Sequence, residues 1–263
     1  MDRVEIIAVG RELLQGQVLD SNSHWLAGQV TALGGEVRRI VVVDDVIDVI
    51  ATEIRTSMGN GAKFIITVGG LGPTFDDQTL EGVAKAINKP LQLDPKALGF
   101  VKERYEYFRS QGYVASDIIS PEREKMARLP QGAAMLPNPI GAAPGIWLDH
   151  GPCHIISLPG VPQELKTIFN ESIAPRLKNI LGPYYHLDRV IKTPLRDESQ
   201  LTSILHEVRT IVPQVYIKSK PTHFGLEVEL EVCLTASGKH YAEVKKRIGK
   251  AIEEIERRLP KDR

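Results

Sequence analysis

The sequence predicts an α/β protein of three layers, in which helices cover both faces of a mostly parallel sheet, with a second, smaller α+β domain. Through the first two-thirds of the chain, strand-like apolar runs alternate with amphipathic helical segments, the order that builds a parallel sheet. This rhythm changes after Gly182-Pro183, which marks a domain boundary. The 263 residues, 42% of them hydrophobic and 25% charged, have the length and composition of such a globular protein.

The first part of the large domain consists of three strand and helix pairs. Asp20 or Ser21 is expected to cap the first helix, whose apolar residues recur at three- and four-residue steps until Gly34-Gly35 ends it. The other elements are apolar runs bounded by turn residues. In chain order we expect strand Val4–Val9, the helix from residue 21 to 33, strand Glu36–Val43, helix Val46–Met58, strand Lys63–Val68 and helix Asp77–Ile87.

The rest of the large domain, which we place at residues 1–175, begins with a long segment that we expect to be helical, residues 91–130. Its clearest amphipathic part is KALGFVKERYEYF. A Pro/Gly-rich loop then separates two short strands, and Pro162 suits the first turn of the last helix. These elements are strands Ala134–Leu136, Gly145–Leu148 and Cys153–Leu158, and a helix from residue 162 to about residue 180.

A smaller α+β domain is expected over residues 183–263, with two helices on a short sheet. Its elements are strand Tyr185–Ile191, helix Ser199–Val212, strand Val215–Lys218, strand Leu226–Thr235 and helix Tyr241–Leu259.

Composition excludes several functional classes. No apolar run approaches the 18 residues of a membrane span, and Met1 leads almost directly into a core strand, so we expect a cytoplasmic protein without a signal peptide. The formal net charge is zero, with 16 Lys and Arg against 21 Asp and Glu in residues 1–175, so the large domain is acidic. We do not expect nucleic-acid binding, because the small domain has no G-x-x-G loop between its helices and a charged hairpin explains His223 and Phe224 better than base stacking does.

The glycine-rich segment GGLGPTFDDQT, residues 69–79, is the most informative for function. It follows a buried strand and opens a helix, where backbone N–H groups and the helix N-terminus attract an anion such as phosphate. A tight turn with a capping-box-like pair of Thr74 and Asp77 is the alternative, but it leaves Asp76 unexplained. Because two carboxylates beside a phosphate would repel it, we expect a divalent metal, most simply Mg²⁺, on Asp76 and Asp77.

Three other loops contain polar groups that suit the same ligand. GRELLQGQVLDSN, residues 10–22, offers Glu12, Asp20 and Asn22; the alternative is a surface loop in which Asp20 caps the following helix. NPIGAAPG, residues 138–145, contains Asn138 and forms either a rigid wall for a flat ligand or a plain hairpin loop. LPGVPQE, residues 158–164, brings Gly160 and another helix N-terminus, with Glu164 as a ligand contact or a helix cap. The segments at residues 10–22, 69–79 and 158–164 all follow strands, and loops at the carboxyl ends of parallel strands meet at one edge of the sheet, so we expect these three to converge on one site.

Together these four segments resemble the N-terminal domain of competence/damage-inducible CinA proteins, a member of the molybdopterin-binding MoaB/Mog superfamily. The resemblance covers roughly residues 1–175, with the motifs in the family's order. Residues 176–263 are similar to the smaller middle domain of the same proteins. The chain ends before the nicotinamide-mononucleotide deamidase domain of full-length CinA, so we do not expect deamidase activity.

The resemblance implies a MoaB/Mog-like fold and metal-dependent hydrolysis of the pyrophosphate in ADP-ribose or a similar dinucleotide. Molybdopterin binding or nucleotidyl transfer, and a non-catalytic nucleotide sensor, are the alternatives. It also implies a homo-oligomer. In this interpretation Asp76 and Asp77 hold the metal, and Glu12 or Asp20 orients the attacking water.

The other implied residues bind the nucleotide and its phosphates. The segment SPEREKMARLP departs from the family, which often has Asn ahead of its basic residues, so Arg123 and Lys125 are either phosphate contacts or part of a solvated helix face. The expected binding residues are Gly69, Gly70, Gly72, Thr74, Asn22, Asn138, Gly141, Gly160, Arg123 and Lys125.

Overall fold

The computed structural model describes residues 2–221 and 229–260, and the chain divides into two compact units. The first comprises Met1–Thr31 and Gly35–Ile180, and the second Ala32–Gly34 and Leu181–Arg263.

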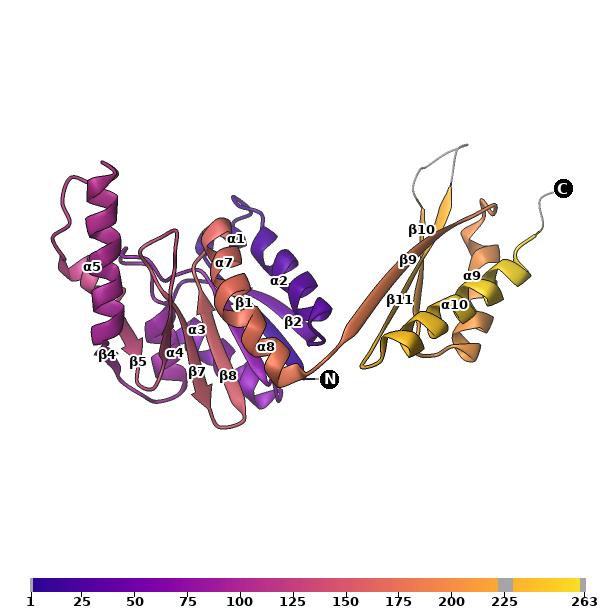
Figure 1. Ribbon diagram of the computed structural model, residues 1–263, viewed down its shortest axis with the longest axis horizontal. Coiled ribbons are helices and arrows are strands. Elements are labelled where there is room, and N and C mark those ends of the chain that lie inside the picture. The colour runs from indigo at the N-terminus through magenta and orange to yellow at the C-terminus, as the bar shows by residue number, and fades with distance from the viewer. Residues whose placement is uncertain (1, 222–228, 261–263) are drawn as a thin grey trace. The chain divides into compact units, whose positions relative to one another are not determined.

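The first unit is built on a six-stranded sheet with the strand order β2-β1-β3-β8-β7-β6 (Figure 1). The first four of these strands are parallel, and β7 and β6 continue the sheet in antiparallel order. The predicted mostly parallel α/β sheet is therefore confirmed. Its strands are β1 (Arg3–Val9), β2 (Glu36–Val43), β3 (Phe64–Val68), β6 (Ala134–Leu136), β7 (Gly145–His150) and β8 (Cys153–Leu158).

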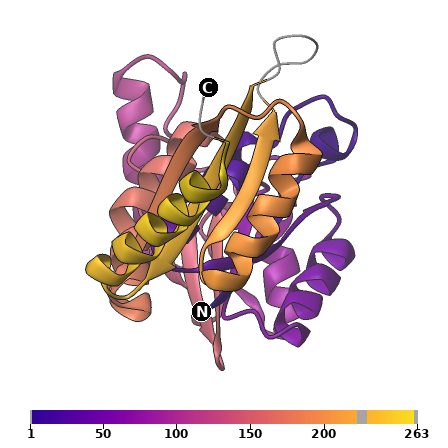
Figure 2. The ribbon, with the colours of Figure 1, turned by 90° about the vertical axis from the view of Figure 1, so that its right-hand side faces the viewer.

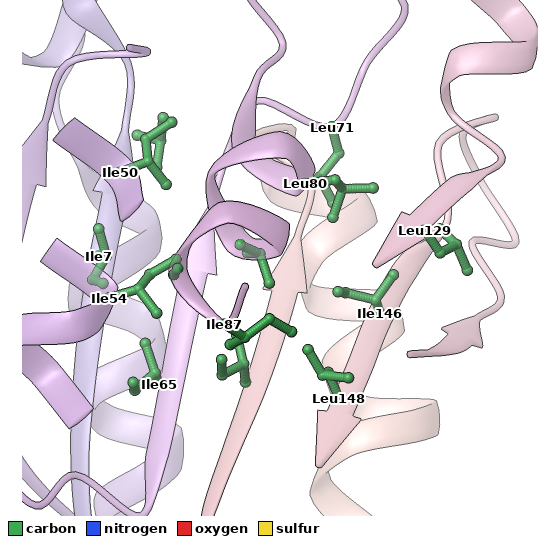
Figure 3. Packing of buried hydrophobic residues seen from close by; sticks show 14 of the residues in the cluster. Ile7, Ile50, Ile54, Ile65, Leu71, Leu80, Ile87, Leu129, Ile146 and Leu148 are labelled. Carbon is green, nitrogen blue, oxygen red and sulfur yellow. The ribbon is translucent and has the colours of Figure 1, made fainter. Parts of the chain in front are cut away.

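Helices lie on both faces of this sheet (Figure 1). On one face α3 (Ile47–Gly59) and α4 (Thr79–Ala86) pack against alternate strand residues such as Ile7 and Ile65, in a core that Figure 3 shows from close by. The other face is covered by α2 (Ser21–Ala32) and a continuous run of α7 (Pro162–Ile168), a π-helical turn (Phe169–Ile173) and α8 (Ala174–Leu181). Trp25 of α2 packs edge to face against Phe169 of this run, with 5.4 Å between the ring centroids.

The expectation that residues 91–130 are helical is wrong at both ends and over residues 111–120, which form turns and loop. Leu91–Leu93 (β4) and Arg128–Pro130 (β5) pair with each other as a separate two-stranded antiparallel sheet. Between them lie α5 (Pro95–Ser110) and α6 (Pro121–Lys125). Three-residue strands carry no periodic signal of their own, and their pairing depends on contacts across the intervening helices.

Two smaller corrections concern the loops that follow β1 and β3. Residues Arg11–Leu14 form a short helix, α1, inside the segment expected to be a loop. Helix α4 begins at Thr79 rather than Asp77, because Asp77 belongs to the preceding turn, in which its N–H donates to the Thr74 carbonyl at 3.2 Å. The turn between β3 and α4 consequently extends to Gln78.

The second unit is a three-stranded antiparallel sheet of order β10-β11-β9, with α9 and α10 on one face (Figure 2). Its core contains Leu201 and Val208 from α9 and Val244 and Ile255 from α10. The predicted small α+β fold is confirmed, while residues 226–228 of the expected strand, and His223 and Phe224, lie outside the described residues. The elements are β9 (Tyr185–Thr193), α9 (Glu198–Ile211), β10 (Tyr216–Pro221), β11 (Leu230–Gly238) and α10 (Tyr241–Arg258).

None of the helices in the described part of the chain is both long enough and apolar enough to cross a membrane.

Candidate functional site

A pocket of about 510 Å³ lies where β1, β3 and β8 end. All four loops singled out in the sequence contribute to its wall, and Asn22 ties the first loop to the last by donating from Nδ2 to the Gly160 carbonyl at 2.7 Å. The strand ends thus bring together segments far apart in the chain, as expected for a parallel sheet. The predicted site residues that line the pocket are Glu12, Asp20, Asn22, Gly69, Gly70, Gly72, Asp77 and Gly160.

The turn after β3 has a backbone suited to an anion. Gly69 and Gly70 have φ values of 98° and 67°, and a Cβ on Gly69 would lie 2.5 Å from the Val9 carbonyl oxygen, so only glycine fits there. Thr79 fixes the turn to α4, since its hydroxyl donates to the Gly69 carbonyl at 2.7 Å and its N–H to the Gly70 carbonyl at 3.1 Å.

The same turn leaves several backbone donors free. Gly70, Leu71 and Gly72 all line the pocket. Among the described residues, none accepts a hydrogen bond from the N–H group of any of the three. Helix α4 begins nearby and has no side-chain cap on its N-terminus. Consecutive unpaired N–H groups at a glycine turn, next to an uncapped helix start, make a site of positive potential.

Three side chains meet at the outer edge of this turn. The Thr74 hydroxyl oxygen lies 2.5 Å from Asp76 Oδ1 and 2.5 Å from Asp77 Oδ2, and Asp77 Oδ2 also accepts from the Thr74 N–H at 2.8 Å. The hydrogen bond from the Thr74 hydroxyl holds the pKa of Asp76 below its ordinary value, so this carboxylate is ionised at neutral pH. Asp77 therefore stabilises the turn, as expected for the capping-box-like pair with Thr74. Asp76 is exposed and contacts the turn through the Thr74 hydroxyl.

The first loop places two carboxylates in the pocket wall. Asp20 caps α2, because its Oδ1 accepts from the Ser23 N–H at 2.9 Å, and it also lines the pocket. The Glu12 carboxylate lies close against Gly10 and is exposed to solvent. Asn22 also lines the pocket, and its buried Oδ1 has no hydrogen-bond partner among the described residues. The pocket wall therefore contains an unused hydrogen-bond acceptor.

Comparison with protein families identifies the first unit. Residues 5–179 match the family described as probable molybdopterin binding domain, which covers more than half of the chain. The chain belongs to this molybdopterin-binding family.

Proteins of similar sequence and a solved structure of similar fold are known. A protein of Pyrobaculum arsenaticum is 43% identical over 225 residues, covering 86% of this chain and 82% of that protein. A protein of Caldivirga maquilingensis is 37% identical over 257 residues, covering 96% of this chain and 95% of that protein. The crystal structure of the protein CinA of Thermoplasma acidophilum, whose function is unknown, is 34% identical, with a TM-score of 0.61 over 67% of this chain and 99% of that one. The resemblance to CinA is thereby confirmed.

The loop at residues 138–145 of this molybdopterin-binding family member is organised by Asn138, which is fully buried but is not itself in the pocket wall. Its Nδ2 donates to the Ala143 carbonyl at 2.9 Å and to Glu164 Oε2 at 2.7 Å, and its Oδ1 accepts from the N–H groups of Ile140 and Gly141. Asn138 and Gly141 therefore position the wall, and Ala142 and Ala143 form it.

The two basic residues of the segment SPEREKMARLP, Arg123 and Lys125, make different contacts. Lys125 Nζ donates to the Thr74 carbonyl at 2.7 Å and so supports the glycine-rich turn. Arg123 donates to the carbonyls of Ser116 and Ile118 and stacks 3.8 Å from the ring centre of Tyr105. Arg123 is thus bound to its own segment, and it orients Tyr105, which lines the pocket.

The described residues contain no group of three or more His, Cys, Asp or Glu side chains placed to hold a metal ion. A metal held by Asp76 and Asp77 would therefore need further ligands from water or from a bound phosphate, as Mg²⁺ in nucleotide sites commonly has.

Sequence reasoning missed several residues of the wall. Tyr105 and Met126 come from the segment expected to be one long helical region, and no local motif marks them. For Glu164 the sequence left open a helix cap or a ligand contact. Helix α7 has no side-chain cap, and Glu164 lies in the pocket wall, where it accepts from Asn138. The signal for this pairing was present in the two family motifs, since each contains one member of the pair.

Proposed function

We propose that the pocket binds a phosphorylated pterin of the molybdopterin class, with its phosphate on the turn from Gly69 to Thr74. The observation that carries the proposal is the row of three unpaired N–H groups at Gly70, Leu71 and Gly72, in the pocket of a chain that belongs to the molybdopterin-binding family. Backbone N–H groups at a glycine turn before a helix bind phosphate without a lysine.

The size and lining of the pocket suit a small planar ligand. Its volume of about 510 Å³ is within the range of small-molecule sites. Tyr105, Met126, Ala142 and Ala143 give it an apolar wall, and the acidic side chains and the glycine turn supply its polar groups.

The charge of the pocket calls for a cation to accompany the phosphate. The described residues of its wall include Glu12, Asp20, Asp77 and Glu164, but no Lys or Arg. We therefore propose that a divalent metal, Mg²⁺ most simply, enters with the ligand and is held by Asp76 and Asp77. Two carboxylates whose oxygens both approach the Thr74 hydroxyl fit this role, because Mg²⁺ usually takes one or two carboxylates together with phosphate oxygens and water.

Titration followed by pterin fluorescence tests this proposal. Neopterin monophosphate in the presence of MgCl₂ should bind saturably, and unphosphorylated neopterin should bind at least about 10-fold more weakly, since a phosphate held by several N–H groups contributes more than 1.4 kcal/mol. Chelation of the metal should weaken the phosphate-dependent part of the binding. Equal affinity for the two pterins would contradict the proposal.

A second candidate is metal-dependent hydrolysis of the pyrophosphate bond of ADP-ribose or a similar dinucleotide. It is favoured by the placement of Asp76 and Asp77 beside the anion-binding turn, with Glu12 and Asp20 in the wall of the same pocket. The metal would polarise the phosphoryl oxygens. Asp76 and Asp77 would hold it, the N–H groups of the turn would stabilise charge on phosphate, and Glu12 or Asp20 would orient water.

Incubation with ADP-ribose and MgCl₂, followed by chromatography for AMP, tests this second candidate. Hydrolysis that is lost in Asp77→Asn while the fold is kept would support it, whereas full metal-dependent activity of the variant would refute the assignment. AMP transfer from ATP to a pterin would identify a nucleotidyltransferase. Tight binding without turnover under any metal would identify a nucleotide sensor.

A further inference from the structure

Glu164 contributes a carboxylate to the pocket wall that is held in a fixed position. Asn138 Nδ2 donates to its Oε2 at 2.7 Å, and Asn138 is itself fixed by its bonds to the backbone of residues 140, 141 and 143. The carboxylate lies directly against Gly141, where a Cβ would be 2.3 to 2.7 Å from its atoms. A side chain at position 141 would displace Glu164, so the loop at residues 138–145 is shaped around this carboxylate.

The hydrogen-bonding capacity of Glu164 is only partly used. A carboxylate accepts about four hydrogen bonds, yet among the described residues Asn138 is the only donor to it. Glu164 is half-buried, and this burial raises its pKa above the ordinary value. The positive charge of Arg104 also acts on this carboxylate, but the guanidinium donates to the carbonyls of Ile140 and Gly141. Further hydrogen-bond donors to the partly desolvated carboxylate therefore come from water or from a ligand in the pocket.

The surroundings of Glu164 indicate which part of a ligand it meets. Ala142 and Ala143, which follow Gly141 in the same loop, are part of the apolar wall with Tyr105. The phosphate-binding N–H groups belong to a different loop, the turn after β3. A ligand with its phosphate on that turn and its ring on the apolar wall therefore offers Glu164 an edge of the ring.

We propose that Glu164 determines the specificity of the pocket by accepting two hydrogen bonds from an amino-lactam edge, a ring N–H beside an exocyclic NH₂ group. Pterins and guanine both present this edge, and its two parallel donors match the two oxygens of a carboxylate. Adenine presents one donor beside a ring-nitrogen acceptor, and that acceptor repels a carboxylate. This inference rests on the proposed function and names the class of heterocycle that the same pocket accepts.

Calorimetric titration with three phosphates in MgCl₂ tests the inference: neopterin monophosphate, GMP and AMP. The wild-type protein should bind neopterin monophosphate, GMP or both about 10- to 100-fold more tightly than AMP, the discrimination expected of a bidentate pair. The tighter of the first two identifies the source of the amino-lactam edge. Glu164→Gln keeps an oxygen for Asn138 but presents one donor and one acceptor, which match adenine rather than the amino-lactam edge. The variant should therefore lose the preference, through weaker binding of neopterin monophosphate and GMP and unchanged or tighter binding of AMP.

Glu171→Gln, which removes the same charge from an exposed position of the π-helical turn outside the pocket wall, serves as the matched control and should retain the preference. Binding of all three phosphates with equal affinity, a preference for AMP, or an equal loss for every ligand in Glu164→Gln would overturn the role of Glu164 and leave the phosphate site intact. Failure of the wild-type protein to bind any of the three would overturn the proposed function itself, and the inference with it.

Discussion

Replacement of Asn138 by alanine should destabilise the first unit strongly, although the residue touches no ligand in our account. The fully buried side chain makes four hydrogen bonds, three to backbone groups and one to the Glu164 carboxylate. Each neutral bond contributes about 1 kcal/mol net and the bond to a carboxylate about 2 kcal/mol, while water entering from the pocket recovers part of the loss. We therefore expect the free energy of unfolding to fall by about 4 kcal/mol.

Urea denaturation followed by tryptophan fluorescence measures this change in the intact protein. Both tryptophans, Trp25 and Trp147, lie in the first unit, so their emission reports the unit that contains Asn138. Asn179→Ala is the matched control, because Asn179 is exposed on α8 and its replacement should change stability by less than about 0.5 kcal/mol.

An Asn138→Ala variant whose unfolding free energy lies within about 1 kcal/mol of wild type, with an unchanged dependence on urea, would contradict this role of Asn138. That result would mean that the loop at residues 138–145 is held by other contacts, and that Glu164 is not fixed through Asn138.

Three further predictions follow from the geometry of the first unit and of the two cysteines. Gly69→Ala should lower the free energy of unfolding by about 2 kcal/mol or more in the same urea assay, because its Cβ meets the Val9 carbonyl of β1. Gly112 has a similar φ of 74° but no atom within 4 Å of an added Cβ, so Gly112→Ala should cost only about 1 kcal/mol. Equal losses would show that the contact with the β1 carbonyl is unimportant. Burial raises the pKa of Glu164 above its ordinary value of 4.5, so the native state holds this proton more tightly than the unfolded state does. The free energy of unfolding should therefore fall as pH rises through the window above 4.5, and Glu164→Gln should flatten this part of its pH dependence. An unchanged pH dependence in the variant would show that Glu164 is not the group responsible. Burial also raises the pKa of Cys153 to about 11, so mass spectrometry after treatment with iodoacetamide at pH 8 should find the half-buried Cys233 alkylated before Cys153, and the reverse order would be inconsistent with the burial of Cys153.

The sheet and its helices could be predicted from the sequence because their signals are local. Apolar runs such as Phe64–Val68 are long enough to mark buried strands, and the glycines after them mark the turns. The two three-residue strands at 91–93 and 128–130 have no such signal. Asp94, which caps α5 with Pro95 in its first turn, marks the start of that helix, but nothing local shows that the preceding residues pair with a strand beyond it.

The candidate site was predictable where its residues share a motif and not where they meet only in three dimensions. The glycine turn and Asp77 are one segment, so the sequence placed them together. Tyr105 reaches the pocket from α5, and only the fold brings it there. For Arg123 the sequence left open a phosphate contact or a solvated helix face. In the fold its guanidinium donates to carbonyls of its own segment and is not directed to the pocket.

A crystal structure of the protein with neopterin monophosphate and MgCl₂ would show which groups hold the phosphate. We expect phosphate oxygens within hydrogen-bond distance of the N–H groups of Gly70, Leu71 and Gly72, and a metal ion held by Asp76 and Asp77. A ligand whose phosphate lies elsewhere, with these N–H groups bound only to water, would contradict the proposed binding mode.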